Sequence, residues 1–300
     1  MDNSNYSTPI NVEEQIENLK RLHLIIEDEE AAKAVLNRIS YYRLIKAYSS
    51  SLKNRETGVY KKGTTFNHIY RLYEFDNELR YILFPLFERI EVTLRCRITN
   101  HFCTKYGALG YHESTNFGAN YDNLYSKICN AIGIASENSP SINHFIRKNG
   151  EMGVPLFAVI EVCSFSTLVL FYKTMLPEDK KAIAKMYYQG KYEYLASWFD
   201  SIVYVRNICA HFGRLYQRNI TKKPMLFHED AEYKDNNRLY AVLLCMRFIC
   251  REYGDWRSTV GAIADLIKEY EDVVKMSGLG FSAGWDKRLL NQEPNLLFFD

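Results

Sequence analysis

The chain has 300 residues, of which 38 are Lys or Arg and 36 are Asp or Glu, so its formal net charge at pH 7 is only +2. This balance argues against a uniformly basic nucleic-acid coat protein, although it permits a locally basic groove. Hydrophobic residues make up 47% and charged residues 25%, which is ordinary for a folded chain, and the length allows one or two domains.

The cysteines and the apolar runs indicate the cellular compartment of the protein. Seven cysteines, an odd number with no C-x-x-C pair, are typical of a reducing compartment. The first residues are polar and acidic and predict no signal peptide. No apolar run reaches the ~20 residues of a membrane-spanning helix. The sequence therefore predicts a cytoplasmic protein that does not contact a membrane.

Helical periodicity dominates the first half of the chain. It predicts helices over Ile10–Leu24, Glu27–Tyr48 and Phe66–Lys105. The polar stretch 49–66 contains two glycines and predicts a loop or a short hairpin. Pro85 lies inside the third helix and predicts a kink or a break there. Residues 106–153 are less regular and predict two short helical segments.

The second half continues the same pattern. Pro155 stands where a first-turn proline opens a helix, here one that runs to Met175, and Pro177 opens the next. Further helices are predicted over Tyr192–Tyr216, Asn237–Tyr253 and Ser258–Met276. The sequence thus predicts an all-α fold. We expect an N-terminal helical segment at 1–60 packed on the core, a helical domain at 61–276 and a tail at 277–300.

One predicted helix carries a polar face suited to chemistry. On a helix over Tyr192–Arg218, an apolar stripe faces the core, formed by Trp198, Ile202, Val205, Cys209, Phe212 and Tyr216. A polar stripe lies roughly opposite, formed by Asn207, His211, Arg214 and Arg218, with Arg206 beside it. Five residues separate Arg206 from His211, so their side chains are ~140° apart around the axis. They could converge only on a ligand beside the helix or across a dimer interface.

Arg206 and His211 together are suited to phosphodiester chemistry. Histidine transfers protons near neutral pH, and arginine stabilises charge on phosphate oxygens. In RNA the ribose 2′-OH supplies the nucleophile, so no metal is required. No His, Cys or carboxylate grouping has the spacing of a metal site, and we expect neither a metal nor a cofactor. An Arg and a His five residues apart also occur often by chance, so the spacing alone leaves a structural role open.

Several ordered blocks resemble one known family. The motif R-N-I-C-A-H-F-G-R-L-Y at 206–216 resembles the signature of Abi-like (abortive infection, AbiD/AbiF-type) proteins, which are members of the HEPN superfamily. Further similar blocks are ISYYRLIKAY at 39–48, GTTFNHIYRLYEFDNELR at 63–80, FERIEVTLRCRI at 87–98, VPLFAVIEVCSFSTLVLFY at 154–172 and YLASWFDSIVYVRNICAH at 194–211. The resemblance covers most of residues 20–225, and residues after about 230 match less distinctly.

The resemblance implies a HEPN-type helical bundle with additional N-terminal and C-terminal helices. It also implies metal-independent RNA cleavage to a 2′,3′-cyclic phosphate and a 5′-OH, in phage defence or as a toxin restrained by a cognate non-coding RNA or an antitoxin. Arg206, Asn207 and His211 would be the catalytic residues. HEPN ribonucleases pair two R-x4-6-H motifs, and this chain contains one, so the resemblance implies a homodimer with a composite active site.

Other residues have weaker assignments. Glu91 and Arg95 fit a second HEPN motif, E-x3-K/R, and an ordinary intrahelical ion pair explains them equally well. We expect Asp76, Glu78 and Arg80 to be structural. The cations that could bind RNA are Arg214, Arg218, Lys222 and Lys223.

Two other functions fit the same residues. The first alternative is a non-catalytic RNA-binding or sensor module of a defence system. The second is a structural helical partner in which Arg206 and His211 only stabilise a dimer.

Overall fold

The computed structural model describes residues 10–187, 191–252 and 254–291 of the chain. Within these ranges the regular elements are α-helices, short 3-10 helices and one π-helical turn, and the only β-type pairs are isolated bridges. The predicted all-α class is therefore confirmed. No helix in the same ranges is both long enough and apolar enough to cross a membrane.

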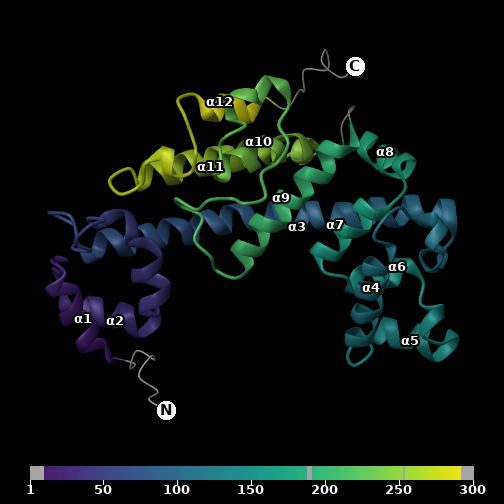
Figure 1. Ribbon diagram of the computed structural model, residues 1–300, viewed down its shortest axis with the longest axis horizontal. Helices are drawn as coiled ribbons and strands as arrows, with labels where there is room; N and C mark the ends of the chain where they lie inside the picture. Colours follow the sequence, from purple (N-terminus) through teal and green to yellow (C-terminus); the bar gives the residue numbers. More distant parts are fainter. Residues whose placement is uncertain (1–9, 188–190, 253, 292–300) are drawn as a thin grey trace.

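The longest element is α3, Phe66–Tyr106, which forms the axis of the molecule (Figure 1). Its 41 residues rise about 60 Å. The Thr65 hydroxyl caps its start by accepting from the N–H of His68 at 3.0 Å, and Gly107, at a φ of 77°, ends it. The helix continues through Pro85, so the break predicted there as one of two outcomes does not occur. Leu83 and Leu86 on either side are buried in the same core, and their packing offsets the cost of the proline.

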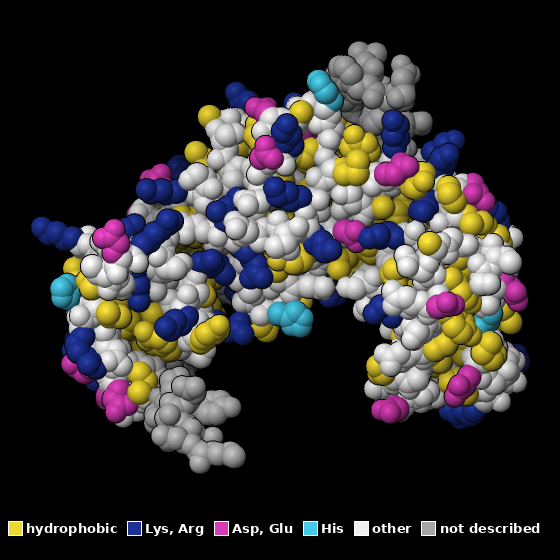
Figure 2. All heavy atoms as spheres, in the orientation of Figure 1, with side chains coloured by type: hydrophobic (Ala, Val, Ile, Leu, Met, Phe, Trp, Pro, Cys, Tyr) yellow, Lys and Arg dark blue, Asp and Glu magenta, His cyan; other side chains and the backbone are white. Residues whose placement is uncertain are grey.

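The two ends of α3 carry different groups of helices. Figure 1 shows α1 (Val12–Arg21) and α2 (Glu29–Arg38) at one end and α4 (Tyr121–Ala135) and α5 (Pro140–Asn149) at the other, on the same side of α3. The surface is hollowed between them, and Lys and Arg side chains gather over the middle of the molecule (Figure 2). The fold therefore has a concave side beneath the centre of α3.

The N-terminal helices differ from the prediction at one point. The helix predicted to run to Tyr48 ends at Arg38, because Ile39 is extended, with φ −123° and ψ 113°. The chain resumes as a π-helical turn over Tyr42–Lys46 that packs on α3. The following polar stretch forms an antiparallel bridge between Lys53 and Tyr60, which agrees with the short hairpin, one of the two outcomes predicted there.

The middle of the chain also contains one more break than predicted. The helix predicted from Pro155 to Met175 is two helices, α6 (Leu156–Val162) and α7 (Phe165–Thr174). Cys163 is extended between them, and the Ser164 hydroxyl starts α7 by accepting from the N–H of Thr167 at 3.1 Å. Helix α8 (Pro177–Lys185) follows as predicted. Its buried Asp179 accepts hydrogen bonds from His101, Lys105 and Tyr106 at the end of α3.

The C-terminal helices cover the other side of α3. They are α9 (Tyr192–Ala210), α10 (Leu239–Ile249), α11 (Trp256–Glu269) and α12 (Trp285–Leu290). Helix α12 packs on α10 and α11, and the Trp256 indole N–H donates to the carbonyl of Leu289 at 2.7 Å. Tyr253 and residues 292–300, which fall in the predicted helix end and tail, lie outside the described residues. The domain boundaries near residues 60 and 276 stay a prediction.

Candidate functional site

The helix that carries the Arg–His motif ends at the histidine. Helix α9 stops at Ala210, and His211 is its C-cap residue. Phe212 follows with a left-handed φ of 56°, and the N–H of Gly213 donates back to the carbonyl of Ile208 at 2.7 Å. This pattern, with the Phe212 N–H bonded to the carbonyl of Cys209, is a Schellman motif. The helix predicted to continue to Tyr216 and Arg218 is therefore too long.

The helix end changes the two predicted stripes. Phe212 does not extend the apolar stripe into the core, because its side chain is 62% exposed. Tyr216 is buried, as predicted, but it lies beyond the turn. Arg214 and Arg218 also lie beyond the turn, so they do not share a helix face with Asn207. The left-handed conformation is uncommon for a bulky residue and costs about 1–2 kcal/mol, so other contacts must hold it.

A buried carboxylate from α3 holds the segment after the turn. Asp76 is fully buried and accepts from the backbone N–H groups of Leu215 and Tyr216, each at 2.9 Å, and from the hydroxyl of Tyr48 at 2.9 Å. Burial raises the pKa of Asp76 to about 6, against the opposing effect of the hydrogen bonds from Tyr48 and from the Tyr216 and Leu215 backbone. Asp76 thereby attaches the end of the motif to the N-terminal third of α3.

Three arginines fix the turn from other sides. Arg43 donates to the carbonyl of Phe212 at 3.0 Å, and its guanidinium lies 5.5 Å from the centre of the Phe212 ring. Arg80, which is buried, donates to the carbonyl of Gly213 at 3.2 Å. Arg214 donates to the carbonyl of Ala47 in the N-terminal segment. The backbone that carries His211 is thus held by α3 and by the N-terminal helices together.

Arg206 contacts the second predicted motif. Its guanidinium donates to the carboxylate of Glu91 on α3 at 3.1 Å, and the same carboxylate also accepts from Arg95. Arg95 is anchored in turn by the carbonyls of Ile160 and Cys163, the latter at 2.7 Å. The structure therefore brings Glu91, Arg95 and Arg206 into one cluster, which joins α3, α9 and the α6–α7 junction.

Asn207 and His211 occupy different environments. The Asn207 side chain accepts from Arg206 at 3.3 Å and donates to the hydroxyl of Ser166 at 3.5 Å. The His211 side chain is exposed, and its imidazole has no hydrogen bond to any described residue. Its two nitrogens are therefore available to a ligand. Asn207, by contrast, is held between α9 and α7.

The predicted RNA-binding cations are only partly available. Lys222 and Lys223 are exposed. Arg214 is engaged by the carbonyl of Ala47. Hydrogen bonds from Thr221 and Arg218 lower the pKa of Tyr204, so Arg218 lies against the Tyr204 hydroxyl.

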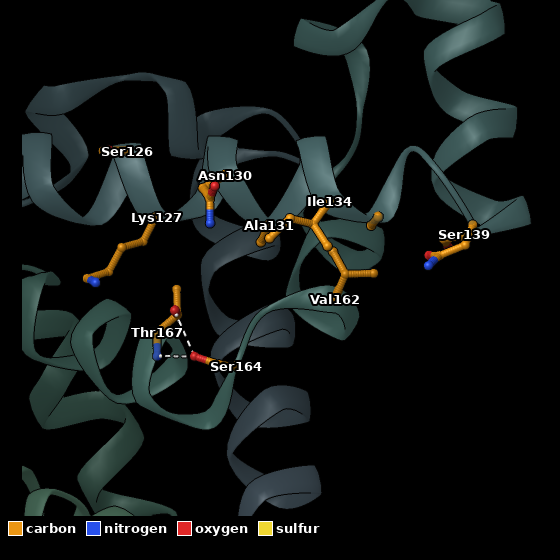
Figure 3. Close-up of a pocket in the computed structure, with 11 residues that line it drawn as sticks. Ser126, Lys127, Asn130, Ala131, Ile134, Ser139, Val162, Ser164 and Thr167 are labelled. Atoms are coloured by element: carbon orange, nitrogen blue, oxygen red, sulfur yellow. Dashed lines mark hydrogen bonds between the residues drawn. The ribbon is translucent and has the colours of Figure 1, made fainter. Parts of the chain in front are cut away.

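A separate cavity of about 720 Å³ lies between α4 and the α6–α7 junction (Figure 3). Ser164 and Thr167 lie on its wall, with a hydrogen bond between their hydroxyls at 3.0 Å. Lys127 is the one charged residue among those that line it, and no motif residue does. The cavity therefore offers no acid–base pair. Among the described residues, no three His, Cys, Asp or Glu side chains are grouped to hold a metal ion.

These observations define an all-α protein with an arginine–glutamate–arginine cluster between two helices and an exposed histidine at the end of one of them. A model of the family described as Abi-like protein matches residues 34–217, more than half of the chain, and the chain belongs to this family. No curated protein and no solved structure matched the chain. The family suggests a role in abortive infection, which is a form of phage defence. The matched region includes both motifs and ends just after the turn, before Arg218.

Sequence reasoning missed the residues that position the motif. Gly213, two residues beyond the histidine, is the available signal for a helix end, because glycine is a poor helix former. The left-handed position itself, where glycine is usual, holds Phe212 instead. Asp76 and Arg80 were expected to be structural, but no sequence pattern linked them to a segment more than 130 positions away. No feature of the sequence indicated that Arg43 contacts this turn.

Proposed function

We propose that this chain is a metal-independent HEPN endoribonuclease that acts in phage defence. The observation that carries the proposal is the exposed imidazole of His211, which has no hydrogen bond to a described residue and sits on a turn fixed by buried groups. A histidine kept only for stability would gain from a partner, whereas a general acid or base must be accessible to substrate.

The arrangement assigns a role to each motif residue. His211 takes the proton from the ribose 2′-OH or gives one to the departing 5′-oxygen. The 2′-oxygen bonds to phosphorus as the P–O5′ bond breaks, which leaves a 2′,3′-cyclic phosphate and a 5′-OH. Arg206 stabilises the charge on the phosphate oxygens. Glu91 and Asn207 engage two of its five N–H donors and leave the others for substrate.

The active site is proposed to be shared between two copies of the chain. Arg206 is directed to Glu91 on α3, while His211 lies five residues on, past the end of the helix. A cavity of about 400 Å³ flanks His211 and is lined by Tyr81, Phe84 and Phe212 among others. Tyr81 is 71% and Phe212 62% exposed. Exposed apolar side chains grouped in this way mark interaction surfaces, and a two-fold interface here would bring the two His211 residues together.

Cleavage without metal tests the proposed function. The purified protein is incubated with mixed RNA in the presence of EDTA, and the ends of the products are analysed. We expect cleavage to persist and the products to carry a 2′,3′-cyclic phosphate or 3′-phosphate and a 5′-OH. Loss of cleavage on chelation would contradict the metal-independent mechanism.

A non-catalytic RNA-binding module is the second candidate. It is favoured by the exposure of Lys222 and Lys223, which could bind phosphates whatever His211 does. Tight RNA binding with no cleavage under any condition would support it. In either case a cognate non-coding RNA or antitoxin is proposed as the restraining partner, and a cytoplasmic location is part of both proposals.

Replacing Phe212 with glycine should weaken the dimer. Glycine adopts the left-handed φ without penalty, so the substitution removes the exposed ring without straining the backbone. The contact of Arg43 with the ring is lost, but its hydrogen bond to the carbonyl at position 212 remains to hold the turn. Truncating an aromatic residue that is an interface hot spot costs about 2 kcal/mol or more, so we expect the dimer dissociation constant to rise by about 30-fold. Sedimentation over a range of concentrations measures it. Ile134→Ala, which truncates an exposed residue on α4, is the matched control and should leave the dimer unchanged.

A further inference from the structure

A cavity of about 250 Å³ lies between α7 and α9, directly beside the proposed active site. Its walls come from α7 (Ser166, Val169, Leu170 and Lys173), from α9 (Asp200, Val203, Tyr204 and Asn207) and from Lys222 in the segment that follows. Asn207 connects it to the motif, because the same side chain accepts a hydrogen bond from Arg206. A ligand in this cavity would therefore lie one residue from the arginine assigned to the phosphate.

The cavity combines an apolar floor with a rim that has one unbalanced positive charge. Val169 and Val203 are almost fully buried and form the floor with Leu170. On the rim, Lys173 is neutralised by Asp200 at 2.5 Å. Lys222 is exposed and has no ion pair with any described residue. A ligand with a flat apolar body and an anionic group matches both parts.

Neutral hydrogen-bonding groups complete the lining. The Asn207 amide donates to the Ser166 hydroxyl at 3.5 Å where the α9 and α7 walls meet, and both groups can exchange this weak mutual contact for a ligand. The Tyr204 side chain also lines the cavity, and the pKa of its hydroxyl is lowered by Thr221 and Arg218. Amides and hydroxyls of this kind read the edges of unpaired bases and the ribose 2′-OH.

We propose that this cavity binds one unpaired nucleotide of the RNA, next to the phosphate that is cut, with its base on the apolar floor and its own phosphate at Lys222. The proposal rests on the proposed function, since it takes RNA as the substrate at Arg206 and His211. The volume is below that of usual drug-sized pockets, which limits the occupant to a single base. The cavity then determines which nucleotide is preferred beside the cut.

Arg218 is not among the residues that line the cavity, and its predicted contact with RNA stays a prediction. Lys222 is the cation of the predicted set that faces the cavity.

Filling the cavity is the direct test. Leu170→Trp places an indole in the space without altering a motif residue. Binding is measured in the full chain carrying His211→Ala, with a short unstructured fluorescent RNA as probe, so that the result does not depend on cleavage. We expect the dissociation constant to rise 10-fold or more, because one base contact is worth about 1–3 kcal/mol. In the chain with His211 intact, Leu170→Trp should weaken the preference for one nucleotide over the others beside the cleaved phosphate.

Lys222→Gln supplies a second variant that does not depend on packing. We expect it to weaken RNA binding and to lower the slope of log K against log salt by about 1, as loss of one phosphate contact does. Lys181→Gln removes an exposed charge on α8 and is the matched control, with no expected change in slope.

The outcomes separate this proposal from the proposed function. If the chain cuts RNA and both variants leave affinity and cleavage preference unchanged, the nucleotide site is wrong while the ribonuclease stands. If the variants weaken binding but no RNA is ever cut, the nucleotide site stands and the ribonuclease is wrong.

Discussion

Replacing His211 with alanine should reduce the rate of RNA cleavage by about 10²- to 10⁴-fold, which is the usual contribution of a general acid or base. The loss should come without a loss of stability. The imidazole is exposed and bonded to no described residue, so its removal should change the free energy of unfolding by no more than about 0.5 kcal/mol. Cleavage rates at saturating RNA and thermal unfolding of the same preparation provide the two measurements.

The matched comparison is His228→Ala, which removes another exposed histidine outside the motif. It should leave cleavage unchanged. Cleavage that persists in His211→Ala would exclude the assigned mechanism, and a large fall in melting temperature would show that His211 has a structural role instead.

Replacing Asp76 with alanine should both destabilise the protein and abolish cleavage. The substitution leaves the backbone N–H groups of Leu215 and Tyr216 and the hydroxyl of Tyr48 without their acceptor in a buried position. Each such group costs about 1–3 kcal/mol, partly offset because a buried carboxylate is removed, so we expect a net loss of about 2–4 kcal/mol. Denaturant unfolding measures the loss. Cleavage should fall because the turn that carries His211 is no longer held.

Asp76→Asn is the reference that does not titrate. Its one carboxamide oxygen replaces only one of the two accepting carboxylate oxygens, so it loses part of the hydrogen bonding at every pH. Because burial raises the pKa of Asp76 to about 6 in the folded protein, its favourable contribution is full below about pH 4 and is lost as the pH rises through 6. The stability of the wild type relative to Asp76→Asn should therefore decrease over this range, by up to about 3 kcal/mol. A difference that does not vary with pH would contradict the assignment.

Helices whose apolar residues recur at a constant three- and four-residue spacing were predictable from sequence. Helix ends and breaks that depend on residues far away in the sequence were not. Helix α3 was predicted within one residue, because its apolar residues recur at three- and four-residue steps over its whole length. Helix α9 was predicted too long, because Phe212 and Tyr216 continue the period beyond the residue at which the backbone turns. The break before α7 was hidden by the apolar run around it, although Ser164 is a typical N-cap residue.

The residues of the candidate site were predictable where a local motif marks them, and their mutual contacts were not. Arg206, Asn207 and His211 were identified from one local motif, and Glu91 and Arg95 from another, since each pair or triplet is close in sequence. That the Glu91 carboxylate binds both arginines depends on how α9 crosses α3, which no local pattern specifies. The support of the turn by Asp76, Arg80 and Arg43 depends on the same packing.

The position of His211 at the helix cap has a consequence for how such a motif can diverge. Inside a helix, one inserted residue would rotate everything after it by about 100° and carry a catalytic group to another face. At the cap, an insertion after Cys209 or Ala210 can be absorbed by rewinding the last turn, while Arg206 stays on Glu91. Selection can therefore tolerate small length changes between Arg206 and His211, provided that the backbone beyond the turn, at Leu215 and Tyr216, still donates its hydrogen bonds to Asp76 on α3.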